Sequence, residues 1–367
     1  MVDEYRTSGV PFLRSQNVLP HRLDLTDVKF IDDKFHSRLK KSALEPGDVV
    51  TVRTGKPGTT AVVPTDLLTA NCSDLVITRP GPELDSRWLS YYVNESAAAF
   101  VAAHLVGAVQ QHFNVGSAKN LELHLPPIFE QRGIAEVLGA LDDKIAANAT
   151  LSAVARNLAV AVVAEASDGN VLLSDLAIHH KRSVAADAMG TGEVWHYSLP
   201  AFDDGMAPAL EDPSSIKSGK FVVGQPSVLV SKLNPRFPRI WDVPSLRLEP
   251  MLASTEFLVL ESRFSTSTVL WAALFQRSFS EHLESKVSGT SGSHQRVRPA
   301  DLLATEVVDV RSLGNEARSK IESLGQRAMA ADAESRELAE VRDVLLPQLM
   351  SGTIRVKDAE EIVGDVV

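Results

Sequence analysis

The chain has 367 residues, of which 44% are apolar and 23% charged, and it carries a formal net charge of −10 at pH 7. Such a chain is long enough for two or three globular domains, each with its own core. Its single cysteine, Cys72, excludes an intrachain disulfide and a cysteine-ligated metal cluster, which favours a reducing, cytoplasmic location.

The first segment, residues 1–127, alternates short β-rich runs with turn signals and predicts a mixed α/β domain. Residues 45–64 predict a strand, a Gly-Pro turn and a second strand, and residues 88–105 predict a helix. No continuous apolar run reaches the roughly 18 residues that span a bilayer. Residues 97–109 come nearest and predict a buried helix, so no membrane contact is expected.

Residues 128–168 predict one long helix, which starts after Pro126 and Pro127 and contains no proline. About 35 helical residues at 1.5 Å each would give a spacer of about 50 Å. Asn148 lies on the apolar seam, where it either sets the register of a helix pair or marks a loosely packed turn. The seam has spacings of three and four: Ile134, Leu138, Leu141, Ile145, Ser152, Ala155, Ala159 and Val162.

Residues 169–312 pass through the same elements in the same order as the first segment, which indicates a second copy of the domain. Arg53 before a Gly-Lys-Pro turn corresponds to Lys232 before an Asn-Pro turn. The second copy has 27 residues between Gly169 and Tyr197, whereas only 11 residues precede Phe12 in the first. The opening strand of the first copy is therefore expected to be missing, through a late start codon or a truncated gene.

Residues 313–352 predict a second long helix, and residues 353–367 a disordered tail. Two helices of similar length, each following a globular domain, pair most economically as an antiparallel coiled coil. The predicted fold class is α/β (α+β), with two duplicated mixed α/β domains separated by two long helices. The pairing is expected to centre on Ile134, Leu138, Leu141, Ile145, Ile321, Leu324, Leu338 and Leu345.

The sequence contains no recognisable motif for catalysis or metal binding. The glycine-rich residues 288–296 lack the Gly-Lys-Ser/Thr ending of a phosphate loop, and no serine-hydrolase or zinc-protease motif occurs. His179 and His180 are adjacent on a predicted strand and would point to opposite faces, which disfavours a shared metal site. We therefore expect no catalytic residue, no metal and no cofactor bound by this chain.

Polar side chains suited to DNA contacts occur at matching positions in both copies. Arginine can hydrogen-bond guanine edges, asparagine and glutamine can bond adenine edges, and lysine meets phosphates. An ordinary polar loop is the simpler interpretation for any one residue, but recurrence in both copies favours DNA. The candidates are Arg53, Lys56, Gln110, Gln111, Asn114, Lys232, Asn234, Arg236, His294, Gln295, Arg296 and Arg298.

The acidic net charge is concentrated outside the two globular copies. Residues 130–169 and 312–367 hold seven of the ten excess acidic residues. Both copies are therefore nearly neutral, which leaves room for a local basic face on each, whereas the acidic helices are better suited to protein partners.

Two phrases, LPPIFEQRGIAEVLGALDDKI at residues 125–145 and ESRELAEVRDVLLPQLMSGTIRV at residues 334–356, resemble the DNA specificity subunit of type I restriction-modification systems. The resemblance covers essentially the whole chain, because this family alternates target-recognition domain, helix, target-recognition domain and helix. The fragments GDVV at residues 47–50 and SKLNP at residues 231–235 are also similar. Two departures are the shortened start and the absence of a Pro-Pro-x-x-Glu-Gln phrase before the second helix.

The resemblance implies a non-catalytic subunit of a complex that is a type I site-specific deoxyribonuclease and adenine DNA methyltransferase. Each recognition domain would read one half of a split double-stranded DNA target, and the helices would fix the gap and carry the modification (methyltransferase) subunits. S-adenosylmethionine, ATP and Mg²⁺ are implied for the modification and restriction (translocase) subunits.

Two other interpretations stay open. A truncated or degenerate specificity subunit would act as a scaffold and read DNA only through its second domain, and a coiled-coil adaptor would bind proteins alone. Salt-dependent DNA affinity distinguishes the adaptor from the others, because phosphate contacts weaken steeply as salt rises. An independent hydrolase would require activity from the purified chain without partners.

Overall fold

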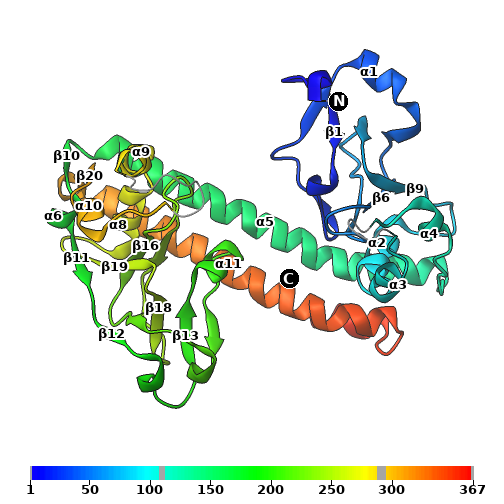
Figure 1. Ribbon diagram of the computed structural model, residues 1–367. Coiled ribbons are helices and arrows are strands. Elements are labelled where there is room, and N and C mark those ends of the chain that lie inside the picture. Colours follow the sequence, from blue (N-terminus) through cyan, green and yellow to red (C-terminus); the bar gives the residue numbers. More distant parts are fainter. Residues whose placement is uncertain (1, 107–111, 287–294, 365–367) are drawn as a thin grey trace. The chain divides into compact units, whose positions relative to one another are not determined.

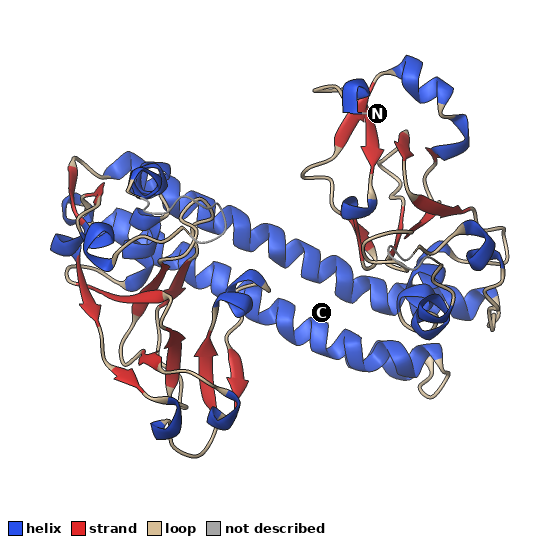
Figure 2. Ribbon diagram, in the orientation of Figure 1, coloured by secondary structure: helices blue, strands red, loops and turns tan. Residues whose placement is uncertain are grey.

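The computed structural model describes residues 2–106, 112–286 and 295–364. It groups the chain into two compact units, one of residues 1–147 with 334–367 and one of residues 148–333 (Figure 1). Each unit combines one globular copy with one half of two long helices, α5 (Ile128–Ala166) and α11 (Asn315–Met350). Sheets and helices are mixed in both units (Figure 2), so the predicted fold class is confirmed.

The first unit contains two main sheets. The four-stranded sheet has the order β4 (Lys29–Ile31), β1 (Val10–Leu13), β8 (Ala70–Cys72), β5 (Ala43–Leu44), with β1 and β8 parallel. The antiparallel three-stranded sheet has the order β7 (Thr60–Val62), β6 (Val49–Val52), β9 (Leu75–Thr78). A short pair, β2 (Val18–Leu19) and β3 (Arg22–Leu23), and the helices α1 (Asp33–Arg38), α2 (Ser86–Asn94), α3 (Ala98–Ala103) and α4 (Val115–Lys119) complete it.

The second unit repeats this plan with longer sheets. One has the order β11 (Ala177–His180), β19 (Phe257–Ser262), β16 (Ser227–Ser231), β17 (Ile240–Val243). The other has the order β12 (Ser183–Val184), β15 (Lys220–Val222), β18 (Met251–Ser254), β13 (Val194–Tyr197), β14 (Ala209–Glu211). A short pair, β10 (Asn170–Leu172) and β20 (Glu306–Val308), and the helices α6 (Leu173–Leu176), α7 (Leu199–Asp203), α8 (Ser267–Leu274), α9 (Arg277–Ser285) and α10 (Pro299–Leu303) complete it.

The duplication extends to strand register. Val49 of β6 pairs with Thr78 of β9, and Val228, at the corresponding position of β16, pairs with Leu260 of β19. Helices α2 and α8 follow these sheets in the two copies, and each starts after a capping side chain whose oxygen accepts a backbone N–H. Equivalent positions can therefore be assigned residue by residue between the copies.

The helix expected over residues 88–105 is two helices, α2 and α3, which corrects that prediction. The cause is Asn94, whose side chain donates to the carbonyl oxygen of Thr60 at 2.8 Å and accepts its N–H at 3.0 Å. This contact to β7 ends α2. Only Val101 of α3 is buried, so the predicted buried helix over residues 97–109 is also wrong in its described part.

Within each unit, α5 and α11 pack antiparallel to each other. In the first unit Arg342 donates to Asp142 at 2.7 Å, and in the second unit Arg156 forms an ion pair with Asp332. Asn148 is buried and has a partner. The predicted seam residues are buried or half-buried: Ile134, Leu138, Leu141, Ile145, Ser152, Ala155, Ala159, Val162, Ile321, Leu324, Leu338 and Leu345. The same is true of Ala328, Ala331 and Val341, which lie at the same spacings in α11.

By length and composition α5 is the single helix among the described residues that meets the criteria for a membrane span. One such helix is weak evidence, because the core helix of a soluble protein passes the same test. In the structure, 28% of the most apolar 18-residue window of α5 is buried.

A glycine lets each long helix approach the N-terminus of a domain helix. A Cβ on Gly325 would lie 2.3 Å from Cγ2 of Thr268 in α8, and a Cβ on Gly139 would lie 2.8 Å from the guanidinium of Arg87 at the equivalent position of α2. The Thr268 hydroxyl is held at 2.6 Å by Asp242, a carboxyl whose pKa burial raises to about 6.

In the described part of the tail, residues 356–364 form a helix, which corrects the predicted disorder there. Helix α12 (Val356–Gly364) places Ala359 and Val363 in the apolar cluster that also contains Leu121 and Leu123 of the first copy. Apolar residues at helical spacing give this segment a face to bury, and burial in a core offsets the entropy of ordering.

This C-terminal segment repeats the start of the second copy. Gly169 and Gly352, which follow the ends of α5 and α11, have φ of 76° and 71°, and α6 and α12 each begin four residues after their glycine. Leu176 of α6 and Ala359 of α12 are the corresponding buried residues. The C-terminal helix therefore occupies the place of an opening helix in the first copy.

In the described residues, the three-stranded sheet of the first copy has one strand fewer than the corresponding sheet of the second copy. In the second copy β11 pairs with the outer edge of β19, whereas β9 pairs only with β6. A cavity of about 90 Å³ lies beside this sheet. Its lining includes Ala118, which corresponds to the buried Leu302 of the second copy.

Candidate nucleic-acid interface

In the first copy, the turn after β6 meets the chain that leads into α4. The backbone N–H of Phe113 donates to the carbonyl oxygen of Arg53 at 2.9 Å. This bond brings the predicted residues Arg53 and Asn114 into one region, and Lys56 is exposed at the turn. Asn114 is also the N-cap of α4, so its side-chain oxygen has a structural partner.

The second copy contains the same arrangement. The N–H of Val297 donates to the carbonyl oxygen of Lys232 at 3.0 Å, the equivalent of the Phe113–Arg53 bond. Asn234, which has a φ of 50°, donates its N–H to the carbonyl oxygen of Gln295 at 2.9 Å. Four predicted residues, including Arg296, are thus assembled from segments about 60 residues apart in the sequence.

The other predicted residues are less closely tied to these bonds. Arg236 is exposed on the β16–β17 turn, and Arg298 is the residue before α10. Gln110, Gln111 and His294 lie outside the described residues.

An acidic residue beside each loop was missed by the sequence prediction. Asp74 directly precedes β9 and lies 3.8 Å from Arg53, and Glu256 directly precedes β19 and accepts a hydrogen bond from Arg296 at 2.8 Å. Aligning the phrases CSDLVIT and STEFLVL would have shown an acid at the same position in both copies.

Buried polar atoms without a partner gather at these loops. In the described part of the chain, three of the eleven such side-chain atoms belong here: Arg53 Nε, Asn234 Oδ1 and Glu256 Oε2. Unsatisfied buried polar groups cost free energy and are uncommon away from functional sites. A ligand that donates to Asn234 Oδ1 and Glu256 Oε2 and accepts from Arg53 Nε would satisfy these atoms.

His179 and His180 point to opposite faces of β11, as the sequence predicted. Burial, together with the positive charges of Lys181 and Lys232, lowers the pKa of His179 to about 4. His180 Nε2 instead lies 2.7 Å from Glu261. Within the described ranges, no group of three or more histidine, cysteine or acidic residues is arranged to hold a metal ion.

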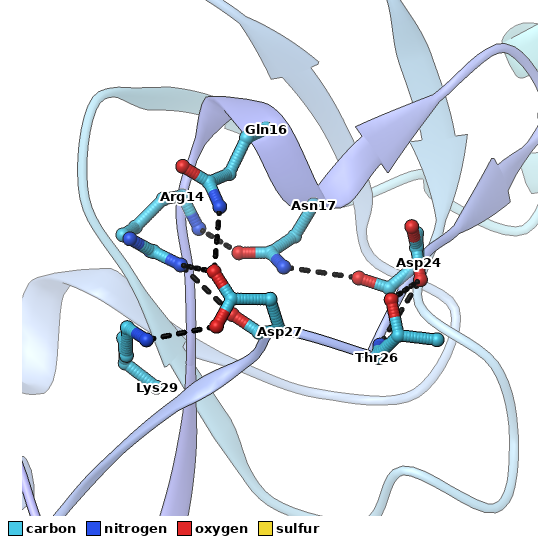
Figure 3. Close-up of polar contacts among 7 residues, drawn as sticks. All are labelled: Arg14, Gln16, Asn17, Asp24, Thr26, Asp27 and Lys29. Atoms are coloured by element: carbon cyan, nitrogen blue, oxygen red, sulfur yellow. Dashed lines mark hydrogen bonds and ion pairs between the residues drawn. The ribbon is translucent and has the colours of Figure 1, made fainter. Parts of the chain in front are cut away.

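Some basic residues of the first copy are committed to internal contacts. Asp27 accepts from Arg14 at 3.3 Å, from Gln16 at 3.1 Å and from Lys29 at 2.8 Å, contacts that are drawn as dashed lines in Figure 3. The Lys29 and Arg14 contacts lower the pKa of the Asp27 carboxyl. These cations stabilise the loop between β1 and β4 and are poor candidates for phosphate contacts.

One face of α5 in the second unit is apolar and exposed. Leu151, Val154 and Leu158 follow each other at spacings of three and four, with exposed fractions of 38%, 57% and 42%. Spacings of this kind place side chains on one side of a helix. At 3.6 residues per turn, the stripe lies about a quarter-turn around α5 from the buried seam residues Ser152, Ala155 and Ala159.

The chain thus has the fold of two mixed α/β domains with a pair of long helices, and this fold has known counterparts. No protein-family model and no curated protein matches the sequence. The crystal structure of the type I restriction-modification system S subunit from M. genitalium is similar, with a TM-score of 0.58 and 14% identity over 95% of this chain and 91% of that chain.

Two further solved structures align at lower scores. The HsdS subunit from Thermoanaerobacter tengcongensis is 16% identical, with 96% and 94% of the two chains covered and a TM-score of 0.35. A structure concerned with complex assembly and conformational transition of the type I R-M system is 16% identical, with 97% and 94% covered and a TM-score of 0.34. At this level of identity the similarity to the M. genitalium S subunit shows a common fold.

Proposed function

We propose that this chain is the DNA specificity subunit of a type I restriction-modification complex. The observation that carries the proposal is the recurrence, at equivalent positions of two copies, of a hairpin and a second loop joined by the same backbone bond. Each pair of loops groups cationic and amide side chains, which are the types that meet phosphates and base edges. The fold of the M. genitalium S subunit supports it.

Two copies of one site in one chain suit a split double-stranded DNA target. Each copy would read one half-site, with Arg53 and Lys56 acting in the first and Lys232, Asn234 and Arg296 in the second. The helices α5 and α11 would determine the gap between the halves. The chain itself would be non-catalytic and cytoplasmic.

The exposed stripe on α5 supports a scaffolding role. An apolar patch of adjacent leucine and valine side chains is a usual protein-binding surface. We assign it to a modification subunit, which would methylate adenine with S-adenosylmethionine. Restriction subunits, with ATP and Mg²⁺, would join the same complex.

Methylation mapping tests the proposal directly. Genomic DNA is compared between cells that express the modification subunit encoded beside this gene with and without this chain. A new adenine-methylated motif with two defined halves is expected. A complex that assembles but yields no motif, and whose DNA affinity is insensitive to salt, would instead favour the adaptor function.

A degenerate specificity subunit is the second candidate, and the shorter sheet of the first copy favours it. The unpaired edge of β9 leaves backbone groups without strand partners in the described residues, which weakens this copy. Its signature in the same experiment is a motif with only one defined half.

A further inference from the structure

The same acidic position flanks the candidate DNA loops in both copies. Asp74 and Glu256 are the residues immediately before the equivalent strands β9 and β19. Their carbonyl oxygens accept the N–H groups of the equivalent residues Arg53 and Lys232, at 3.3 and 2.9 Å. The fold therefore fixes both acids beside the loops through the backbone.

The acidic side chain at this position pairs with an arginine, by a hydrogen bond in the second copy and by a longer ion pair in the first. Glu256 Oε1 accepts from Nη2 of Arg296 at 2.8 Å, and the Glu256 side chain is 25% exposed whereas that of Arg296 is 62% exposed. In the second copy the acid is thus the more buried partner and the guanidinium extends toward solvent, whereas in the first copy Arg53 is 36% exposed and Asp74 45%. In the first copy Asp74 lies 3.8 Å from Arg53, and its φ of 59° is a left-handed conformation that Asp tolerates better than most residues.

A carboxylate at the mouth of a DNA-binding loop opposes phosphate binding by charge. Because the carboxylate occurs in both copies, we expect it to provide a benefit that offsets this repulsion. An arginine side chain has several rotatable bonds, and reading a guanine edge requires its planar fork in one orientation. A carboxylate on one side of the guanidinium restricts these rotations before DNA arrives.

We infer that Asp74 and Glu256 are positioning residues that orient Arg53 and Arg296 for base reading, and so determine sequence specificity at the cost of overall DNA affinity. This inference rests on the proposed function. The inference predicts different effects on sequence specificity and on overall DNA affinity. Removing the carboxylate charge should lower discrimination between sequences, while non-specific attraction to phosphates should be unchanged or increased. A purely structural role for the acids would lower both together.

The test uses the complex with the modification subunits. The wild-type methylation motif is mapped first, and duplexes with the motif intact or with either half scrambled then serve as probes. For Glu256→Gln we expect the affinity ratio between the intact and one scrambled duplex to fall about five- to fifty-fold. Affinity for DNA with both halves scrambled is expected to stay equal or rise.

Two further variants complete the design. Asp74→Asn should affect the other half-site, and because Asn also tolerates a positive φ it keeps the test available if Glu256→Gln does not fold. Glu261→Gln is the matched control, since it removes the same charge from β19 in a pair with His180. This control should leave the affinity ratio unchanged.

The outcomes separate the inference from the proposed function. A wild-type complex with neither a methylated motif nor sequence-specific binding removes the proposed function, and the inference with it. A specific wild-type complex in which both variants keep the same affinity ratio, or lose affinity equally on all duplexes, overturns the inference alone.

Discussion

Replacing Gly325 with alanine tests whether close approach of α11 to α8 is required in the second unit. The new Cβ would lie 2.3 Å from Cγ2 of Thr268, far inside van der Waals contact. Thr268 cannot simply rotate away, because its hydroxyl is held at 2.6 Å by the buried Asp242. The helix or the threonine must therefore shift.

The equivalent glycine of the first unit provides the reference. Alanine at Gly139 would meet only the guanidinium of Arg87, the far end of a flexible and half-exposed side chain. Both substitutions gain about 1 kcal/mol of helix propensity. Overpacking costs about 1–3 kcal/mol at Gly325 and little at Gly139. We therefore expect Gly325→Ala to be less stable than Gly139→Ala by about 1–3 kcal/mol.

The free energy of unfolding of each variant is measured by denaturant titration, with hydrogen exchange of α8 and α2 peptides to assign the effect to a unit. Thr268→Ser removes the clashing methyl group but keeps the hydroxyl for Asp242. Combined with Gly325→Ala, it should recover most of the stability that Gly325→Ala loses. This recovery is counted after allowing for the roughly 0.8 kcal/mol that losing a buried methyl group costs by itself. Equal stability of the two alanine variants, or no recovery in the double variant, would refute the packing argument.

Three other predictions follow from the structure. Burial lowers the pKa of His21 to about 4 from 6.5, so the unfolded state binds more protons between these values and the first unit should lose stability as pH falls through this range; His21→Asn should show a smaller difference in unfolding free energy between pH 7 and pH 5. Ala118→Leu, which copies the equivalent Leu302, should stabilise the first unit by up to about 2 kcal/mol by filling the 90 Å³ cavity, and a lower melting temperature would show that the cavity cannot accept it. Val154→Glu should weaken co-purification of a modification subunit at least tenfold, whereas Asn157→Glu, an exposed position of α5 outside the apolar stripe, should not; equal effects would exclude the stripe as the contact.

The sequence was sufficient for the features that depend on local periodicity. The seam residues from Ile134 to Leu345 are buried or half-buried because spacings of three and four place them on one helix face. The hairpin and loop positions could be matched between copies because duplicated domains keep the same order of strands. The correspondence of Arg53 and Lys232 follows from this order.

The features that were missed depend on contacts between distant segments. The end of α2 at Asn94 is set by a hydrogen bond to β7, which no helical pattern reports. The folding of α12 depends on a core built from the first copy, more than 200 residues earlier in the chain. Asp74 and Glu256 escaped notice because a carboxylate is significant there only through its distance from an arginine on another loop.

The division of the chain into a continuous and a discontinuous unit has a consequence for biosynthesis. All residues of the second unit, 148–333, leave the ribosome before the last segment of the first unit, 334–367, is made. Domains generally fold as their residues become available during translation. The first copy therefore stays incomplete longest. Until the last segment is made, its apolar residues that later contact α11 and α12 remain exposed to solvent. The folding yield of the first copy should therefore depend on chaperones and on translation speed more than the folding yield of the second copy does.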